Sequence, residues 1–487
     1  MDTACTTRPA KRVKRADEDG SLKYNPGFGN LACSEALPGA LPAGQNNPQR
    51  CPYGLYAEQL SGTAFTKPRK ENARVWLYRI RPSVQHAPME ALPQSDTFGG
   101  VHSLDMNPDP NQMRWMPVDI ESSARVTFVQ GLKTYGAAGD PTLKHGLAVH
   151  YFTANAPMGD SCMVNCDGDF LIVPQKGVMR VRTEFGIMRV EPNEICVVQR
   201  GMRFSVDPSD DNESGELRGY ILEIYAKHFD LPDLGPIGSN GLANPQDFLS
   251  PVAWYEDRDC DFVCITKYGG RLFQSTMAFS PYNVVAFRGN YLPYKYDLRK
   301  FNCMNSVTYD HPDPSIYTVL TCQTDEAGVA VADFVIFPPR WMAMENTFRP
   351  PWYHRNTMSE FMGMIWGEYD AKGGSKGSDG KPKGFVPGGA SLHSCMVPHG
   401  PDAGTFSKAS KINGLQQPVF FDKGLAFMFE TTYMLKLSKW ALEGDHRDKE
   451  YYKCWASLPH QFDPNEKPPT GASDILAWRA ERSNGSA

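Results

Sequence analysis

The stretch that decides the fold runs from Asp167 to Val206 and reads DGDFLIVPQKGVMRVRTEFGIMRVEPNEICVVQRGMRFSV. Five short apolar runs recur in it, and a glycine or a proline separates each run from the next: Phe170–Val173, Met179–Val181, Met188–Val190, Ile195–Val198 and Phe204–Val206. Short β-branched and aromatic runs between turn residues are typical of antiparallel strands. The spacing therefore predicts a small antiparallel barrel or sandwich.

This pattern resembles the cupin (jelly-roll) repeat. No histidine lies within the stretch, so we expect this barrel to hold no metal. The chain is 487 residues long and contains 43 Gly and 39 Pro, and a second strand-rich unit follows residue 299. Together these features predict a mainly β, two-domain cupin-like protein of jelly-roll or β-sandwich type, with extensive ordered loops. The one stretch that we predict to be helical is Tyr433–Leu442.

The expected organisation has four parts. Residues 1–22 form a disordered basic N-terminal arm, with a nuclear-import patch as an alternative interpretation. Residues 23–298 form an N-terminal β domain that contains the metal-free barrel around 167–206, and residues 299–464 form a C-terminal cupin-like domain with the metal site. Residues 465–487 form a disordered tail.

Composition and charge exclude several classes of partner. The formal net charge of −5 gives no general attraction to nucleic acid or to anionic membranes. No run of about 18 apolar residues exists, so we expect no transmembrane helix. Met1–Gly20 lacks the apolar core of a signal peptide. We interpret the twelve scattered cysteines as free, buried thiols in a reducing, cytoplasmic setting. A structural zinc site built from the two CxxxC pairs, Cys162/Cys166 and Cys260/Cys264, is the alternative.

The candidate metal ligands cluster around Arg349–Phe361, which reads RPPWYHRNTMSEF. It contains His354 and Glu360, and His399 follows further on. Two imidazoles and one carboxylate make a non-haem Fe(II) centre that leaves coordination positions open. Six residues span about 20 Å in a strand or about 9 Å in a helix, whereas ligands of one ion lie about 3 Å apart, so the chain must turn within Arg355–Ser359. The alternative is that His354 is a core histidine and Glu360 is solvated.

Several long motifs resemble those of the homogentisate 1,2-dioxygenase family. They include YNPGFGN from Tyr24, LPDLGPIGSNGLANP from Leu231, FRPPWYHRNTMSEFMG from Phe348 and VPHGPD from Val397. The resemblance extends from about Lys23 to Pro464. It implies an Fe(II)-dependent, extradiol-type ring-cleaving dioxygenase that uses O₂ to open homogentisate to maleylacetoacetate in tyrosine and phenylalanine catabolism. It also implies a larger N-terminal β domain, an iron-holding C-terminal domain and assembly as a dimer of trimers.

Residue roles follow from the resemblance position by position. The iron ligands fall on His354, Glu360 and His399. The active-site base falls on His311 and the contact with the substrate carboxylate falls on Tyr369, with His399 also touching the substrate. The resemblance further implies a supporting role beside the metal for His393. We also expect Trp352 and Asn356, two residues before and two residues after His354, to support the metal site.

Two departures keep alternatives open. Trp352 stands where relatives carry tyrosine, and the glycine- and lysine-rich Ala371–Gly384 is an insertion relative to the family. A paralogous dioxygenase acting on a related hydroquinone or hydroxyphenylacetate is therefore the first alternative. A non-enzymatic bicupin binding protein is the second, and a zinc hydrolase is the third, although the chain lacks an HExxH motif.

Overall fold

The computed structural model describes residues 22–43, 50–233, 242–303, 317–344, 352–369, 371, 375–376, 382–410 and 417–465. His311 lies outside the described residues. The predicted disordered arm and tail, and most of the Ala371–Gly384 insertion, lie outside them as well.

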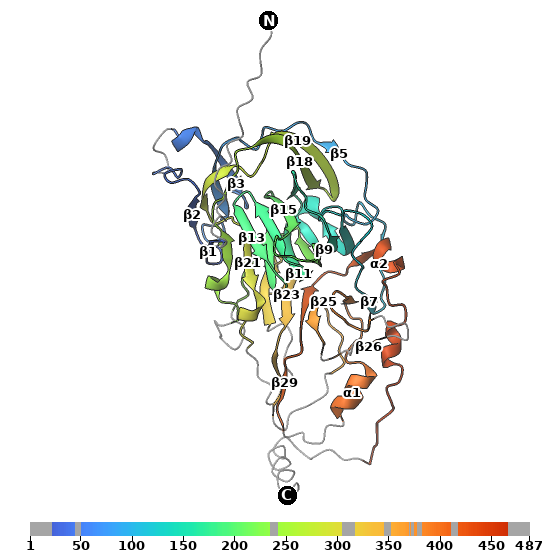
Figure 1. The fold of residues 1–487 in the computed structure, drawn as a ribbon. Helices are drawn as coiled ribbons and strands as arrows, with labels where there is room; N and C mark the ends of the chain where they lie inside the picture. Colours follow the sequence, from blue (N-terminus) through green and yellow to red (C-terminus); the bar gives the residue numbers. More distant parts are fainter. Residues whose placement is uncertain are drawn as a thin grey trace.

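Strands dominate the described chain and assemble into four main sheets (Figure 1). The ten-stranded sheet has the order β1 (Tyr24–Pro26), β17 (Leu249–Pro251), β21 (Tyr294–Asp297), β14 (Glu194–Val198), β11 (Asp169–Lys176), β16 (Leu217–Ile224), β9 (His145–Ala154), β8 (Leu132–Asp140), β31 (Lys436–Ser438) and β6 (Met106–Asn107). The seven-stranded sheet has the order β13 (Gly186–Val190), β12 (Met179–Thr183), β15 (Arg203–Pro208), β10 (Ser161–Asn165), β18 (Asp259–Tyr268), β19 (Arg271–Phe279) and β5 (Glu90–Ala91).

The remaining sheets are smaller. The four-stranded sheet has the order β2 (Ala32–Glu35), β20 (Val284–Gly289), β4 (Arg74–Arg79) and β3 (Tyr56–Ser61). The six-stranded sheet has the order β22 (Thr318–Gln323), β23 (Ala330–Phe337), β30 (Gly424–Thr431), β25 (Ser359–Gly367), β28 (Ala390–His393) and β7 (Met113–Trp115). Two-stranded ribbons pair β24 (Arg340–Ala343) with β29 (Val419–Phe421), and β26 (Ser375–Lys376) with β27 (Pro382–Lys383).

Helices are few and short among the described residues. The α-helices are α1 (Ala403–Ser410) and α2 (Lys439–Glu443). The 3₁₀ turns are η1 (Pro52–Gly54), η2 (Pro141–Leu143), η3 (Pro245–Asp247), η4 (Leu298–Lys300) and η6 (Tyr451–Trp455). This composition confirms the predicted fold class, a mainly β, cupin-like protein.

All five apolar runs of the opening stretch are strands, as predicted, and they form β11 to β15. The glycines between them lie at the corners. Gly177 and Gly201 have φ of +79° and +82°, a conformation that a residue with a Cβ adopts only with strain. The turn residues therefore set the strand ends, and the apolar runs fill the strands.

The ten-stranded sheet is buried on both faces, which explains the unbroken apolar run in β11. Phe170 and Ile172 point into the core shared with the seven-stranded sheet. Leu171 and Val173 point into the core shared with the six-stranded sheet. Because successive strand residues face opposite sides, one strand serves two cores. The molecule is thus layered, with the ten-stranded sheet in the middle.

Each half of the chain contributes a strand to a sheet that is formed mainly by the other half. β7, from the first third of the sequence, pairs with β28 at the edge of the six-stranded sheet. β31, from near the C-terminus, pairs with β8 in the ten-stranded sheet. The larger apolar core lies between these two sheets and draws side chains from both halves. We conclude that the N- and C-terminal halves fold against each other.

The predicted helix over Tyr433–Leu442 is largely wrong. Lys436–Ser438 forms strand β31, and only Lys439–Glu443 is helical. The edge of β8 offers main-chain hydrogen bonds to this segment, and Ser438 then caps α2 by accepting a hydrogen bond from the Ala441 amide. Tertiary pairing thus overrides the local helical pattern.

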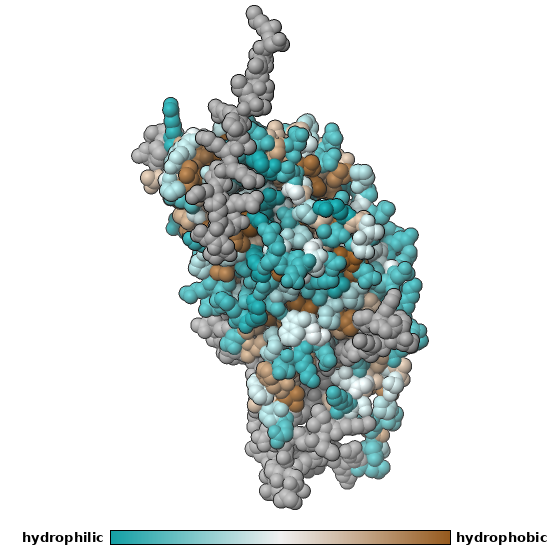
Figure 2. Space-filling model, in the orientation of Figure 1, coloured by the Kyte–Doolittle hydropathy of each residue, from teal (hydrophilic) through white to brown (hydrophobic). Residues whose placement is uncertain are grey.

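The visible surface is predominantly hydrophilic, and hydrophobic residues occur on it as small separate patches (Figure 2). Within the described residues no helix has both the length and the apolar character needed to cross a membrane.

Candidate metal centre

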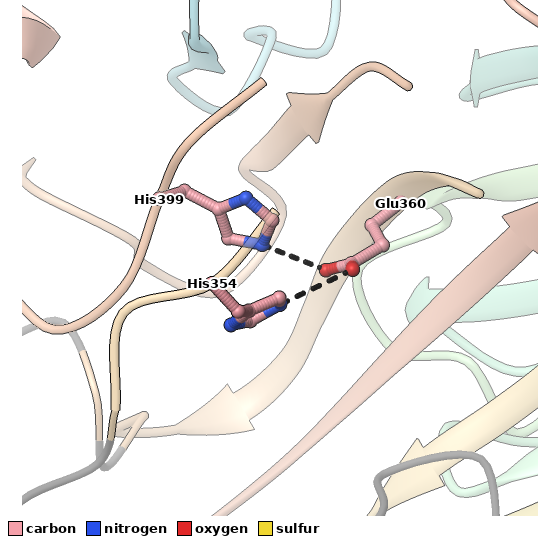
Figure 3. Close-up of side chains that lie close together, drawn as sticks. All are labelled: His354, Glu360 and His399. Carbon is pink, nitrogen blue, oxygen red and sulfur yellow. Dashed lines mark hydrogen bonds and ion pairs between the residues drawn. The ribbon is translucent and has the colours of Figure 1, made fainter. Parts of the chain in front are cut away.

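Three potential metal ligands meet at the end of the six-stranded sheet (Figure 3). The Nε2 atom of His354 lies 3.3 Å from Oε1 of Glu360, and Nε2 of His399 lies 3.0 Å from Oε2 of the same carboxylate. All three ligand atoms lie within 4.8 Å of one another. Among the described residues this is the only group of three or more histidine, cysteine, aspartate or glutamate ligands with such spacing.

The backbone holds the two histidines side by side. The amide of His354 donates to the carbonyl of His399 at 2.9 Å, and the amide of His399 donates back at 3.0 Å. This isolated antiparallel bridge brings together residues that are 45 positions apart in the chain. Their ring centroids lie 4.1 Å apart. Glu360 comes from a regular element, because it is the second residue of β25.

The chain turns between His354 and Glu360, as the spacing requires. Asn356 stabilises this turn, since its side-chain oxygen accepts a hydrogen bond from the Met358 amide at 3.0 Å. The turn does not form a hairpin in which His354 ends one strand and Glu360 starts its partner. His354 pairs with His399 rather than continuing as a strand beside β25.

Burial and close contacts shift the pKa of Glu360 in opposite directions. Burial by itself would raise the pKa of its carboxyl group. Close contacts with His354, His399 and Asn356 outweigh burial and hold that pKa well below its usual range. Asn356 Nδ2 donates to Glu360 Oε1 at 2.9 Å and to Glu430 Oε1 at 2.9 Å. Glu360 is therefore an ionised carboxylate with one oxygen held in place.

The donor set fits a divalent cation. The Nδ1 atom of His399 lies 2.9 Å from the carbonyl oxygen of Val397, which can only accept, so Nδ1 carries the proton. Without a metal a proton can lie between Nε2 and the Glu360 carboxylate 3.0 Å away, and a cation that replaced this proton would face two acceptors, the imidazole lone pair and the carboxylate. Two facing acceptors are complementary to a metal ion, and fixing the far ring nitrogen is the usual way to orient a histidine ligand.

His393 supports the centre from behind. Its ring stacks on that of His399, with centroids 4.0 Å apart and planes 8° apart. His393 Nε2 lies 3.0 Å from the hydroxyl of Tyr451, and both residues are buried. His393 therefore lies against a candidate ligand, and its supporting role stays a prediction.

The other predicted site residues lie as follows. Tyr369 is partly buried and packs edge-on against Phe337 and Phe385. Burial raises the pKa of Tyr451, and the nearby phenol of Tyr369 adds to that rise, so the two hydroxyls lie in one region. Trp352 is partly buried two residues before His354.

Two further residues, Glu430 and Tyr451, contact the centre and were not predicted from the sequence. Glu430 is the strand partner of Glu360 across β25 and β30, and Tyr451 lies on η6. Glu430 ends the apolar run Leu425–Glu430, and a carboxylate in such a run is a signal that could have been noticed.

The interpretation of all cysteines as buried thiols is wrong in part. The eleven described cysteines are free, but two are exposed: Cys33 lies on the edge strand β2, and Cys166 directly follows the end of β10. The alternative of a four-cysteine zinc site is not supported among the described residues, because β10 and β18 run parallel with Cys162 opposite Cys264. In that register the two CxxxC pairs are displaced from each other by four residues along the strands.

Fold and site together define a class: a cupin-like β protein with a two-histidine, one-carboxylate candidate metal centre. Comparison with known proteins is more specific. Residues 23–298 match the family model described as homogentisate 1,2-dioxygenase N-terminal, and residues 299–462 match the corresponding C-terminal model. The chain belongs to the homogentisate 1,2-dioxygenase family.

Curated relatives are similar over nearly their whole length. Homogentisate 1,2-dioxygenase of Homo sapiens is 56% identical over 456 residues, which cover 92% of this chain and 98% of the relative. The protein of the same name from Arabidopsis thaliana is 52% identical over 91% of this chain and 93% of the relative. Among solved structures, an oxalate decarboxylase of Lactobacillus farciminis aligns over 68% of this chain and 89% of its own at 10% identity, with a TM-score of 0.29. That likeness is too remote to bear on the chemistry.

Proposed function

We propose that this chain is an oxidoreductase that opens the ring of homogentisate with O₂, giving maleylacetoacetate, with Fe(II) as its cofactor. The observation that carries the proposal is the cluster of His354, Glu360 and His399 in a chain of this family. The donor set suits Fe(II), because two imidazoles and one carboxylate on one side leave positions for substrate and oxygen. When bound, the iron would supply those positions and the one-electron chemistry that couples an aromatic ring to O₂.

The chain's own residues would prepare the site in three ways. Glu360 stays ionised and offers negative charge, because its contacts keep its pKa low. His399 presents Nε2 because Val397 fixes the proton on Nδ1. Asn356 restrains one carboxylate oxygen and so limits how Glu360 can rotate.

Substrate handling is assigned to His399 of the metal cluster and to residues outside that cluster. In this proposal the hydroxyl of Tyr369 donates to the substrate carboxylate and orients the ring. His311 would accept a proton from a ring hydroxyl of the substrate, since an imidazole with a pKa near 6.5 can take and return a proton at neutral pH. His399 touches the substrate as well as the metal, and Trp352 shapes the approach.

We further propose the setting in which this activity operates. The chain divides into an N-terminal domain of residues 23–298 and a C-terminal domain of residues 299–464 that holds the iron. It assembles as a dimer of trimers in the cytoplasm and serves tyrosine and phenylalanine catabolism. Light scattering of the purified chain tests the assembly, and a mass other than six subunits would reject it.

Oxygen uptake tests the activity. The chain is purified without oxygen, loaded with Fe(II) and mixed with homogentisate, while uptake and the absorbance of the ring-opened product are followed together. We expect one O₂ consumed per product formed. Turnover with a related hydroquinone or hydroxyphenylacetate but not with homogentisate would instead favour the paralogous enzyme. Bound iron without any turnover would contradict the proposal.

A further inference from the structure

A second reactive site lies in the seven-stranded sheet, apart from the metal centre. In Figure 1 this sheet, with β18 and β19, lies at the end of the molecule opposite to α1 and β29. Cys162 on β10 and Cys264 on β18 are directly opposed in a parallel ladder. Residues opposed in this way point to the same face of the sheet. Both thiols are buried, with 0% and 3% of their surfaces exposed.

The register of β10 and β15 places the cationic side chain of Arg203 on the same face of the sheet as the two cysteines. Val164, two residues after Cys162 and therefore on the same side, pairs with Arg203 on β15. Arg203 is mostly buried, with its side chain 11% exposed. Its Nη2 donates to the Ser83 carbonyl at 3.2 Å, whereas Nη1 is buried without a hydrogen-bond partner and lies 3.7 Å from Glu184. The guanidinium is thus incompletely paired beside the two sulfurs.

A cavity of about 220 Å³ opens onto this face. Cys264, Arg203, Thr266, Ser275 and the exposed Cys166 are among its lining residues. The cavity is large enough for a small polar molecule to reach the sulfur of Cys264.

The surroundings favour a thiolate at Cys264. The neighbouring Cys162 thiol, the Arg203 guanidinium and the Thr266 hydroxyl lower the pKa of Cys264 and together outweigh burial, which by itself would raise it. Burial raises the pKa of Cys162, which therefore keeps the shared proton. A cationic neighbour and an opening to solvent are the environment in which reactive cysteines occur, and Arg203 and the cavity supply both at Cys264.

We propose that Cys264 is a peroxide-reactive nucleophile and that Cys162 is its resolving cysteine. The Cys264 thiolate attacks one oxygen of a small hydroperoxide, the O–O bond breaks, and the leaving oxygen takes a proton to become water or an alcohol. Cys264 is then a sulfenic acid. The sulfur of Cys162 attacks it, the S–S bond forms, the S–O bond breaks, and the hydroxide released takes the Cys162 proton. In sum, two thiols and one peroxide yield one disulfide and two molecules of water, or one of water and one of alcohol.

Geometry permits the disulfide. Opposed residues on neighbouring strands have Cα atoms about 4.8 Å apart, which lies within the range of about 4.4–6.8 Å found for disulfides. Cys166 does not compete for this pairing, because its strand partner would be Tyr268 rather than Cys264 and its own thiol is exposed.

The first experiment measures native alkylation of the full, iron-loaded chain, site by site, with mass spectrometry. We expect Cys264 to react at about pH 6 faster than the exposed Cys33 does, because the neighbouring Cys162 thiol and Arg203 guanidinium lower the pKa of Cys264. Arg203→Gln should slow labelling of Cys264 about tenfold while leaving Cys33 unchanged. Labelling of Cys264 that is no faster than that of Cys33, or that is indifferent to Arg203, would overturn the nucleophile assignment.

The second experiment exposes the same protein to one equivalent of hydrogen peroxide and maps cross-linked peptides. We expect a Cys162–Cys264 peptide in the wild type. In Cys162→Ala, which leaves Arg203 in place, a dione probe should instead trap a sulfenic acid on Cys264. Cys196→Ser, a buried cysteine elsewhere in the domain, should behave like the wild type. Because the readout is the state of two sulfurs, it is independent of ring cleavage. Neither cross-link nor trapped sulfenic acid would overturn the proposal.

Discussion

The ring of His393 lies parallel to the ring of His399, 4.0 Å away, with its far nitrogen 3.0 Å from the Tyr451 hydroxyl. The Val397 carbonyl restrains one edge of the His399 ring, and the stacked ring of His393 restrains its face. A ligand restrained in this way needs little reordering when a metal binds.

Replacing His393 should weaken metal binding without removing a ligand. We expect His393→Ala to reduce iron affinity about 10–100-fold, the usual cost of losing a group that orients a ligand. His393→Phe keeps the stacked plane but loses the contact with Tyr451, so its affinity should lie between those of the wild type and the alanine variant. Competition with a chelator measures this. Equal affinities in all three proteins would contradict the positioning role.

Replacing Glu360 should abolish metal binding. Glu360→Gln removes the negative charge and one strong oxygen ligand, so we expect iron affinity to fall more than about 100-fold, beyond the effect expected at His393. Glu368→Gln is the matched control, because Glu368 follows the same strand but is exposed. Iron content after dialysis provides the measurement. A Glu360→Gln protein that retained one iron per chain would remove Glu360 from the ligand set.

A buried lysine stabilises the N-terminal half. Lys267 Nζ lies 2.7 Å from Asp167 and 2.8 Å from Glu223, and Glu223 also lies 2.9 Å from His150. The contact with Lys267, supported by His150, outweighs burial and lowers the pKa of Glu223 to about 2. The stability that Glu223 contributes is therefore present above its unfolded pKa of about 4.3 and is lost as the pH falls toward 2.

Lys267→Met should destabilise the fold by about 3–5 kcal/mol at neutral pH, because it leaves buried carboxylates without their cation. The pKa of Glu223 then rises, so the penalty grows as the pH rises above about 4.3 and the variant should be closer to the wild type at about pH 5 than at pH 7. Lys176→Met, which removes a partly exposed ion pair with Glu216, should cost less than about 1 kcal/mol. Thermal melts of the Lys267→Met variant and the wild type at about pH 5 and pH 7 test this prediction. An equal loss of stability at the two pH values would contradict it.

Gly363, on the strand β25 that carries Glu360, leaves no space for a side chain. A Cβ there would lie 2.3 Å from the ring of Phe427 and 3.1 Å from that of Tyr220. We expect Gly363→Ala to cost about 1–3 kcal/mol through overpacking. Gly100→Ala is the control, since its Cβ would meet only Tyr225 at an ordinary 3.5 Å. Chemical denaturation gives both values, and similar costs at the two positions would show that the crowding at Gly363 relaxes.

Much of the fold could be predicted locally, since glycine and proline punctuate the strands from Phe170 to Val206 and the apolar runs fill them. The sequence also limited the candidate ligands, because the six-residue spacing of His354 and Glu360 permits a shared metal only if the chain turns. What local pattern could not show was that Phe170 and Leu171 enter different cores. That depends on the sheets stacked on either face.

Only the tertiary structure decided which groups support the centre. His354 meets His399 through a bridge across 45 residues, Glu430 meets Glu360 through strand register, and Tyr451 reaches His393 from η6. The segment Tyr433–Leu442 shows the same dependence, because the open edge of β8 turns part of it into a strand. Residue type and spacing set which chemistry is available to this chain. Long-range pairing, whose energy depends on partners far away in the sequence, sets where that chemistry comes together.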